Sequence, residues 1–247
     1  MNGRPMKALY DTIGINYTEL RKPDSRIAAL VHDSLGAAES IVNVGAGTGS
    51  YEPSERSVIA VEPSLEMTRK RTRPAHALVQ ARAEQLPFAN DSFEASMGVL
   101  TIHHWHDQKA GLLEMRRVCR GPITLLTFDP AHRPWLTDYL PQIAQLDEQQ
   151  MPSINFYEQC LGPVDIMAVP IPHDCTDGFL HAYWRRPHAY LDERIKTGMS
   201  TFWKIDDTQA GLSKLSDDID SGEWERRYAR LLDADEYDAG YRLVTTI

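Results

Sequence analysis

The 247-residue sequence lacks the features that mark membrane, exported and nucleic-acid-binding proteins. Its apolar runs fall far short of the roughly 20 residues that span a bilayer, and its first twenty residues contain no apolar signal core. Positive charge is also scarce, because 26 Lys and Arg face 35 Asp and Glu and leave a net charge of −9. Most nucleic-acid affinity comes from a basic surface. We therefore expect a cytoplasmic protein that binds neither a membrane nor nucleic acid.

Cysteines, linkers and repeats are equally sparse. The three cysteines, Cys119, Cys160 and Cys175, show no CxxC spacing, so we expect reduced, buried thiols and no metal site. No Gly/Ser-rich linker or internal repeat divides the chain, and we expect a single domain over residues 1–247. The one basic run, residues 69–73, follows an expected helix and is interpreted as the solvated C-terminal end of that helix.

In the first half of the chain, short apolar runs alternate with helical patterns, which is typical of a largely parallel sheet. The expected strands are Ser40–Val44, Val58–Val61, Ala77–Gln80, Glu94–Leu100 and Ile123–Phe128. The expected helices between them are Pro63–Arg71 and Asp107–Cys119, the second with Ala110, Leu113, Met115 and Val118 facing the core. The first crossover, residues 45–57, includes Pro53 and is barely long enough for a parallel connection, so we expect its helix to be stunted or reduced to a turn.

The second half of the chain is richer in aromatic residues. Their number doubles from seven in residues 1–128 to fourteen in residues 129–247, which favours a segment that covers an apolar or aromatic substrate. We expect strands at Val164–Ile171 and Tyr241–Ile247, and helices at Asp206–Ser221 and Glu223–Leu232. The fold class is therefore predicted as α/β: a Rossmann-like, mostly parallel sheet with helices on both faces, plus a helical, aromatic-rich segment that covers the substrate.

The strongest local signal is a glycine-rich turn after the first expected strand. Gly45, Gly47 and Gly49 alternate along it, and backbone without side chains lets a ligand approach closely. A dinucleotide fingerprint would place its third glycine at position 50, which is Ser50, and no Lys-Ser/Thr pair follows to bind a nucleotide phosphate. The GxGxG spacing is that of S-adenosylmethionine-binding loops, although a tight bend without a ligand could use the same residues.

An acidic residue ends the second expected strand. Glu62 lies 13 residues after Gly49, and an ionised carboxylate at this place can accept hydrogen bonds from both hydroxyls of a ribose. A helix-capping or surface glutamate is the alternative. The combination with the glycine turn favours the ribose interpretation.

A third feature is the segment AE-x-LPF-x-x-x-SF at residues 83–93. With it, residues 10–128 resemble the class I S-adenosylmethionine-dependent methyltransferases, most closely the small-molecule group that includes the ubiquinone and menaquinone biosynthesis enzymes. The resemblance implies S-adenosylmethionine as cofactor. It further implies a segment over the cofactor in residues 1–36, a cofactor-binding core in 37–130, and substrate-covering helices with the last sheet strands in 131–247.

The resemblance also implies which residues contact the cofactor. These are Tyr17, Gly45, Ala46, Gly47, Gly49, Glu62, Pro63, Ala83, Glu84 and Leu100. The glycines would pass beneath the methionine part, Glu62 would hold the ribose, and Ala83 and Glu84 would lie beside the adenine. Tyr17, with Tyr10, would either fold over the cofactor or only pack.

The chain departs from the pattern of these enzymes at three places. These enzymes usually have an acidic residue two positions before the first glycine. In this chain that position is Asn43, which carries no charge. Arg82 stands where the group often has an aspartate against the adenine. The short first crossover reduces the helix wall beside the methionine part.

Three histidines, at positions 103, 104 and 106, follow the fourth expected strand, where ligands bind in open α/β sheets. Imidazole titrates near neutral pH, so His103 or His104 is a candidate base that takes a proton from the acceptor. A structural role and a metal site are alternatives. Adjacent His103 and His104 are expected to point apart, and Asp107 has a simpler role as a helix cap, so we predict no metal.

Substrate contacts are expected beyond the fifth strand. Asp129 lies at the corresponding edge, with a turn residue as the alternative, and Trp135 and Tyr139 are candidate lid contacts, with the core as the alternative. We predict methyl transfer to the oxygen, nitrogen or carbon of a small organic acceptor by in-line displacement, in a monomer or homodimer. The alternative is a cofactor-bound protein that does not methylate, such as a cyclase or a regulatory partner.

Overall fold

The structure, a computed structural model, describes residues 17–71 and 77–247 and divides into two compact units. The first, here called the sheet unit, consists of Ser25–Pro130, Gln150–Val169 and Tyr241–Ile247. The second, the helical unit, contains residues 17–24, Ala131–Gln149 and Pro170–Gly240. Among the helices of the described ranges, none combines the length and the apolar character needed to cross a bilayer.

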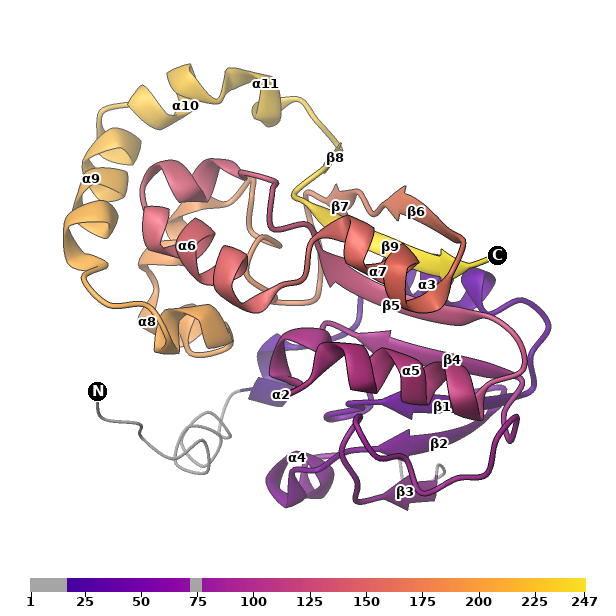
Figure 1. The fold of residues 1–247 in the computed structure, drawn as a ribbon. Helices are drawn as coiled ribbons and strands as arrows, with labels where there is room; N and C mark the ends of the chain where they lie inside the picture. The colour runs from indigo at the N-terminus through magenta and orange to yellow at the C-terminus, as the bar shows by residue number, and fades with distance from the viewer. Residues whose placement is uncertain (1–16, 72–76) are drawn as a thin grey trace. The chain divides into compact units, whose positions relative to one another are not determined.

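A seven-stranded sheet forms the centre of the sheet unit, in the order β3-β2-β1-β4-β5-β9-β6 (Figure 1). Its parallel strands are β1 (Ser40–Val44), β2 (Ser57–Val61), β3 (Ala77–Val79), β4 (Ala95–Val99) and β5 (Ile123–Phe128). The last strand, β9 (Tyr241–Thr246), runs antiparallel to both β5 and β6 (Val164–Ala168). The predicted α/β class with a mostly parallel sheet is confirmed.

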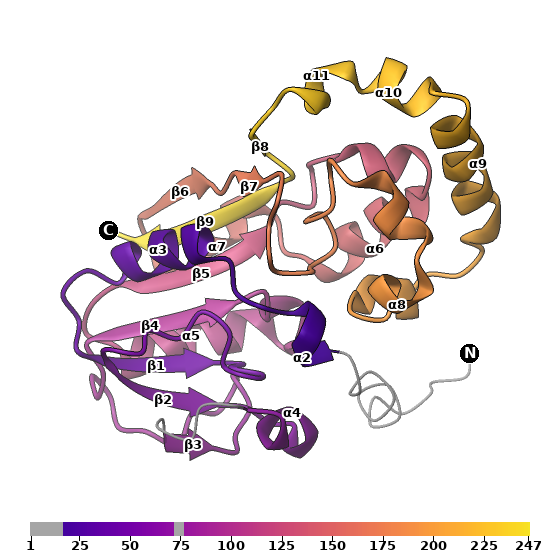
Figure 2. The same ribbon diagram turned by 180° about the vertical axis from the view of Figure 1, so that it is seen from behind.

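Helices cover both faces of this sheet. Helices α5 (Gln108–Val118) and α7 (Ile154–Leu161) lie over one face, and α3 (Ser25–Ser34) lies over the other (Figures 1 and 2). Asp107 caps α5, because its carboxylate accepts the Ala110 N–H at 2.9 Å, as predicted. The predicted core face of α5 is wrong at one position, since Leu113 is 45% exposed and Leu112 is fully buried.

The first crossover contains no helix. Residues 45–56, all described, form only turns and bends between β1 and β2, as its length and Pro53 predicted. The next crossover has the short helix α4 (Leu65–Arg69), which begins where the Ser64 hydroxyl accepts the Met67 N–H at 3.3 Å. The carboxyl end of β1 is therefore followed by an irregular loop that other residues must hold in place.

The helical unit is built from short elements. They are α2 (Tyr17–Leu20), η2 (Trp135–Asp138), α6 (Pro141–Gln150), β7 (Ile171–Pro172), η3 (Pro187–Leu191), α8 (Glu193–Lys196), η4 (Ser200–Trp203), α9 (Gln209–Asp220), α10 (Glu223–Arg227), α11 (Ala229–Leu232) and β8 (Glu236–Tyr237). Two predictions were too coarse: the helix expected at Glu223–Leu232 is interrupted at Tyr228, and the strand expected at Val164–Ile171 is split into β6 and β7. Pro170, which lies between the two strands, explains the split, because proline lacks the N–H that a continuous ladder needs.

An aromatic cluster forms the core of the helical unit. Trp135, only 4% exposed, packs edge-on against Trp224 at 5.2 Å and Tyr190 at 5.5 Å between ring centroids. Its indole N–H donates to the Trp184 carbonyl at 2.8 Å, so the polar atom of the buried ring is satisfied. Much of the aromatic enrichment of the second half of the chain therefore serves packing within this unit.

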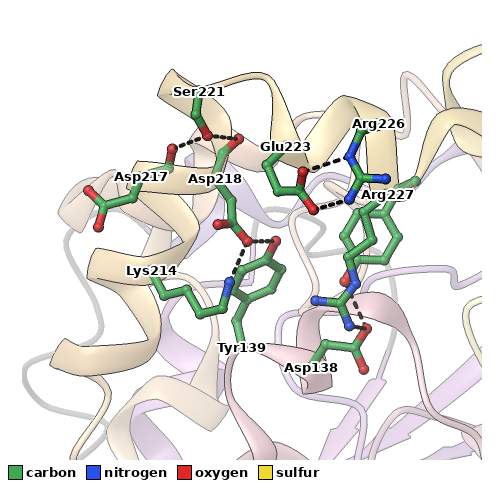
Figure 3. A network of polar contacts seen from close by, with 10 residues as sticks. Asp138, Tyr139, Lys214, Asp217, Asp218, Ser221, Glu223, Arg226 and Arg227 are labelled. Carbon is green, nitrogen blue, oxygen red and sulfur yellow. Dashed lines mark hydrogen bonds and ion pairs between the residues drawn. The ribbon is translucent and has the colours of Figure 1, made fainter.

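A network of charged and hydroxyl groups joins η2 to α9, α10 and the turn that follows α10 (Figure 3). The Tyr139 hydroxyl donates to Asp218 at 2.7 Å, and Lys214 donates to the same carboxylate oxygen at 2.6 Å. Asp138 accepts from Arg227 at 2.9 Å and from the Tyr228 hydroxyl at 2.7 Å. These residues are called the surface network below.

Candidate functional site

The glycine loop lies at the carboxyl ends of the parallel strands. Gly45, Gly47 and Gly49 have φ angles of +71°, +53° and +88°, a region that side chains disfavour. The N–H groups of Gly45 and Ala46 donate to the Val61 carbonyl at 2.9 and 3.0 Å, which anchors the loop to β2. A Cβ atom on Gly45 would lie 1.9 Å from the Thr101 hydroxyl oxygen. The first glycine is therefore required both by its backbone angles and by the close approach of the chain after β4.

Glu62 connects the end of β2 to this loop. One carboxylate oxygen accepts the Gly47 N–H at 2.8 Å and the other accepts the Ser64 N–H at 2.9 Å. Burial raises the pKa of Glu62, while the N–H groups of Ser64 and Gly47 and the nearby charge of Arg71 oppose that rise. A carboxylate offers about four acceptor positions, so Glu62 retains acceptors for two further hydrogen bonds.

A buried ion pair beneath the loop was not predicted. Arg71 donates to Glu52 at 2.6 Å, with 6% and none of their side chains exposed, and Glu52 also accepts from the Asn43 amide at 2.9 Å. The predicted solvation of the basic run holds for Arg69, 71% exposed, but is wrong for Arg71. Arg71 differs from Arg69 by its partners in the irregular crossover, the Gly47 carbonyl and Glu52, 19 residues away. No periodic signal marks that position.

Ala83 and Glu84 lie next to the segment that follows β4. Ala83 is buried, and Glu84 accepts the His106 N–H at 2.7 Å and the Asp107 N–H at 3.2 Å. A Cβ atom added to Gly111 would lie 2.5 Å from the Trp105 ring and 3.2 Å from the Ala83 Cβ, so these three residues pack tightly. Glu84 thus holds the entry to α5 through its side chain.

The end of β4 is conformationally strained. Leu100 has a φ of +49°, which is costly for a residue with a Cβ, and its N–H donates to the Leu126 carbonyl at 2.8 Å. After it, His103 and His104 lie in η1 (Ile102–His104), both half-buried. Their ring centroids are 3.9 Å apart, so the expectation that the two side chains point apart is wrong. Within residues 17–71 and 77–247, no group of three or more His, Cys, Asp and Glu could hold a metal ion.

The remaining predicted site residues are more dispersed. Asp129, half-buried, follows β5, and Pro63 is exposed after β2. Trp135 and Tyr139 lie in the aromatic core of the helical unit, each 4% exposed. Tyr10 lies outside the described residues, and Tyr17 begins α2 but its side chain also lies outside them. The structure thus brings together the glycine loop, Glu62 and Thr101.

Known proteins resemble this chain in both sequence and fold. The profile of a family described as "Methyltransferase domain" matches residues 42–122, from β1 to the residue before β5. A solved structure from Anabaena variabilis, assigned as a methyltransferase from an antibiotic biosynthesis pathway, is 33% identical and superposes with a TM-score of 0.84. That likeness covers 92% of this chain and 99% of the Anabaena chain.

Among curated relatives, a demethylmenaquinone methyltransferase of Renibacterium salmoninarum is 33% identical over 44% of this chain, which spans only about half (51%) of that protein. A Porphyromonas gingivalis protein of the same name is 27% identical over 60% of this chain and 71% of its own length. The [4+2]-cyclase SpnF, 12% identical with a TM-score of 0.56 over 97% of this chain and 92% of its own, shares the fold and gives the cyclase alternative no further support.

Proposed function

This chain belongs to the class I S-adenosylmethionine-dependent methyltransferases, and we propose that it methylates a small apolar acceptor that carries a ring. The names of its curated relatives support this acceptor class, because they include demethylmenaquinone and 2-methyl-6-phytyl-1,4-hydroquinone methyltransferases. The observation that carries the cofactor assignment is Glu62, a buried carboxylate aimed by two backbone N–H groups at the end of β2.

The residues present fit S-adenosylmethionine. A ribose diol needs two acceptors on one rigid group, and Glu62 retains that capacity while its hydrogen bonds to Gly47 and Ser64 fix its orientation. Beside it, the position of a Cβ on Gly47 has, among the described residues, only the Met67 methyl within 4 Å, at 3.5 Å, so the loop presents bare backbone there. When bound, the cofactor would supply a methyl group on a sulfonium, whose neutral thioether is a good leaving group.

The residues around the site would bind and orient the reactants. Methyl transfer depends on close alignment of the acceptor and on the exclusion of water. The glycine loop would support the methionine part, Ala83 would lie against the adenine, and Leu100, with its strained backbone, would lie on the sulfonium side. Asp129 remains our candidate for substrate contact, and the 4% exposure of Trp135 and Tyr139 favours their alternative, packing in the core of the helical unit.

A base is needed only where the acceptor must lose a proton. We propose that His103 or His104 takes that proton, because both imidazoles follow directly from the end of β4. Replacing both by alanine should lower turnover at least tenfold while leaving cofactor affinity unchanged. If turnover of the double variant stays within twofold, the histidines are structural.

Calorimetric titration with S-adenosylhomocysteine tests the cofactor assignment. We expect micromolar binding to the natural chain and a loss of at least tenfold in Glu62→Ala. Glu66→Gln is the matched control, because Glu66 lies on the neighbouring α4 and pairs with the exposed Arg69. Binding that persists in Glu62→Ala would remove the ribose role of Glu62. If the natural chain does not bind, the proposal is wrong.

A further inference from the structure

The ion pair of Glu52 and Arg71 lies directly against the glycine loop. A Cβ atom on Gly49 would lie 3.0 Å from the Arg71 Nη2 atom and 3.0 Å from the Glu52 Oε2 atom. The other guanidinium nitrogen, Nη1, donates to the Gly47 carbonyl at 3.3 Å. The pair is thus in contact with the loop at both of its last two glycines.

Gly47 is held from both sides as a result. Its N–H donates to Glu62 at 2.8 Å, and its carbonyl accepts from Arg71, which Glu52 holds in place. A glycine at φ +53° has no side chain to restrict it, so these two contacts determine the orientation of its peptide groups. The same peptide groups border the ribose acceptor Glu62.

Burial of this pair is better explained by positioning than by stability. Taking two charges out of water costs about as much as their attraction returns, so a buried pair adds little net stability over apolar residues. The chain also forms no helix directly after the loop, because residues 45–56 consist only of turns and bends. A helix would have supported the loop and directed its positive N-terminal end at it. Arg71 instead places a fixed positive charge there.

We propose that Glu52 is a positioning residue of the cofactor site, which acts through Arg71 to hold the Gly47 peptide and supplies the buried negative charge that Asn43 lacks. This inference rests on the proposed function, since the ligand whose site is positioned is S-adenosylmethionine. The Asn43 amide donates a hydrogen bond to Glu52 at 2.9 Å, so the two side chains are adjacent. A carboxylate at either position could therefore serve the loop.

The test exchanges the acid and the amide. Glu52→Gln removes the charge at constant shape, and we expect S-adenosylhomocysteine to bind about 10- to 100-fold more weakly, by analogy with the loss of a residue that orients a metal ligand. Adding Asn43→Asp returns a carboxylate to the pair with donor and acceptor reversed, and the amide oxygen introduced by Glu52→Gln can still accept from Arg71. We expect this exchange variant to recover at least half of the lost binding free energy.

A control separates loss of stability from loss of position. Glu94 is also an ion-paired glutamate of the sheet unit, bonded to Arg120 at 2.9 Å, but it lies at the amino end of β4. Glu94→Gln should lower the thermal midpoint without changing the affinity for S-adenosylhomocysteine. Binding is read by calorimetry and the unliganded fold by circular dichroism, so neither measurement depends on methyl transfer.

The outcomes distinguish a failure of the proposed function from a failure of the positioning role of Glu52. If the natural chain does not bind S-adenosylhomocysteine, the proposed function fails. If the natural chain binds and Glu52→Gln binds equally well, the positioning role is wrong. The role is also wrong if the exchange variant binds no better than Glu52→Gln, or does not fold, because the exchange conserves charge and shape. Should Glu52→Gln alone not fold, binding by the exchange variant within tenfold of the natural chain supports the proposal.

Discussion

Two ion pairs, one in each unit, use charge in different ways. In the sheet unit, Glu52 and Arg71 form an ion pair with 0% and 6% of their side chains exposed. In the surface network of the helical unit, Asp138 and Arg227 are 42% and 43% exposed, so their 2.9 Å contact is accessible to solvent (Figure 3). The first pair lies against a loop whose own crossover, residues 45–56, forms no helix, while the second lies over an aromatic core that is already well packed.

This difference teaches where a charge is indispensable. An exposed ion pair contributes about 0–1 kcal/mol, because water and salt replace either partner. A buried pair adds little as a pair, yet removing one member leaves a charge without solvent or counterion and costs about 3–5 kcal/mol. We therefore expect the loop pair to be sensitive to single substitutions and the surface network to be tolerant.

The largest effect is expected for Arg71→Met. It leaves the Glu52 carboxylate buried beside a methionine, and we expect the free energy of unfolding of the sheet unit to fall by about 3–5 kcal/mol. Arg69→Met is the matched control from α4, and its effect should stay below about 1 kcal/mol because Arg69 is 71% exposed. Urea unfolding followed by far-ultraviolet circular dichroism measures both. Equal effects would mean that burial does not set the difference.

The second prediction concerns what stabilises the helical unit instead of its charges. In the natural chain the Trp135 indole N–H donates to the Trp184 carbonyl at 2.8 Å. Trp135→Phe keeps an aromatic ring but removes this donor, and we expect the free energy of unfolding to fall by about 2 kcal/mol. Asp138→Asn, in the surface network of the same unit, should cost less than about 1 kcal/mol. Four of the five tryptophans lie in the helical unit, so tryptophan fluorescence during urea unfolding follows this unit. A larger loss in Asp138→Asn would reverse the comparison.

The sheet was predictable because its signals are local. Four of the first five strands are short apolar runs followed directly by a polar residue or glycine, and β2, β3 and β4 differ from prediction by one residue at one or both ends. The glycine loop and Glu62 were predictable for the same reason, since backbone freedom and a carboxylate at a strand end are visible in a few residues. The structure places them in contact, since Glu62 accepts the Gly47 N–H, and their role in cofactor binding stays a prediction.

The rest depends on partners distant in sequence. Arg71 cannot be told from the nearby Arg69 by local sequence, and its contacts with Glu52 and the Gly47 carbonyl account for its burial. The core face of α5 was misassigned by one position because Leu112 and Leu113 are equally apolar, and packing against the sheet selects between them. Such choices are made by tertiary contacts, which periodicity alone does not encode.

The third prediction uses pH to separate the two regions. Burial raises the pKa of Glu62 above its usual 4.5, so its proton stabilises the unliganded fold at low pH and that contribution is lost as pH rises through the folded pKa. Ribose binding needs the ionised carboxylate, so affinity for S-adenosylhomocysteine should fall severalfold as pH is lowered from 7 toward 4.5. Calorimetry at several pH values measures this, and Glu62→Gln should show a flat profile.

The surface network should not respond over that range. Hydrogen bonds from Lys214 and Tyr139 hold the pKa of Asp218 below its usual 3.8. The stabilisation of the fold by the ionised Asp218 is therefore complete above that pH and is lost only as pH falls further. A change of tryptophan fluorescence in step with the loss of binding would instead mean that the helical unit titrates with the cofactor site.

The smallest effect is expected within the surface network itself, between the two donors to Asp218. Tyr139 is 4% exposed and its hydroxyl donates at 2.7 Å, so Tyr139→Phe should cost about 1 kcal/mol, the net value of one hydrogen bond. Lys214 donates at 2.6 Å, but its side chain is 56% exposed and water can replace it, so Lys214→Met should cost less than about 0.5 kcal/mol. Tryptophan-monitored urea unfolding at low and at high salt checks the assignment, because only the lysine effect should shrink as salt screens it. If Lys214→Met costs more than Tyr139→Phe, then exposure does not rank the polar contacts of the surface network, and the contrast with the Arg71 pair loses its physical basis.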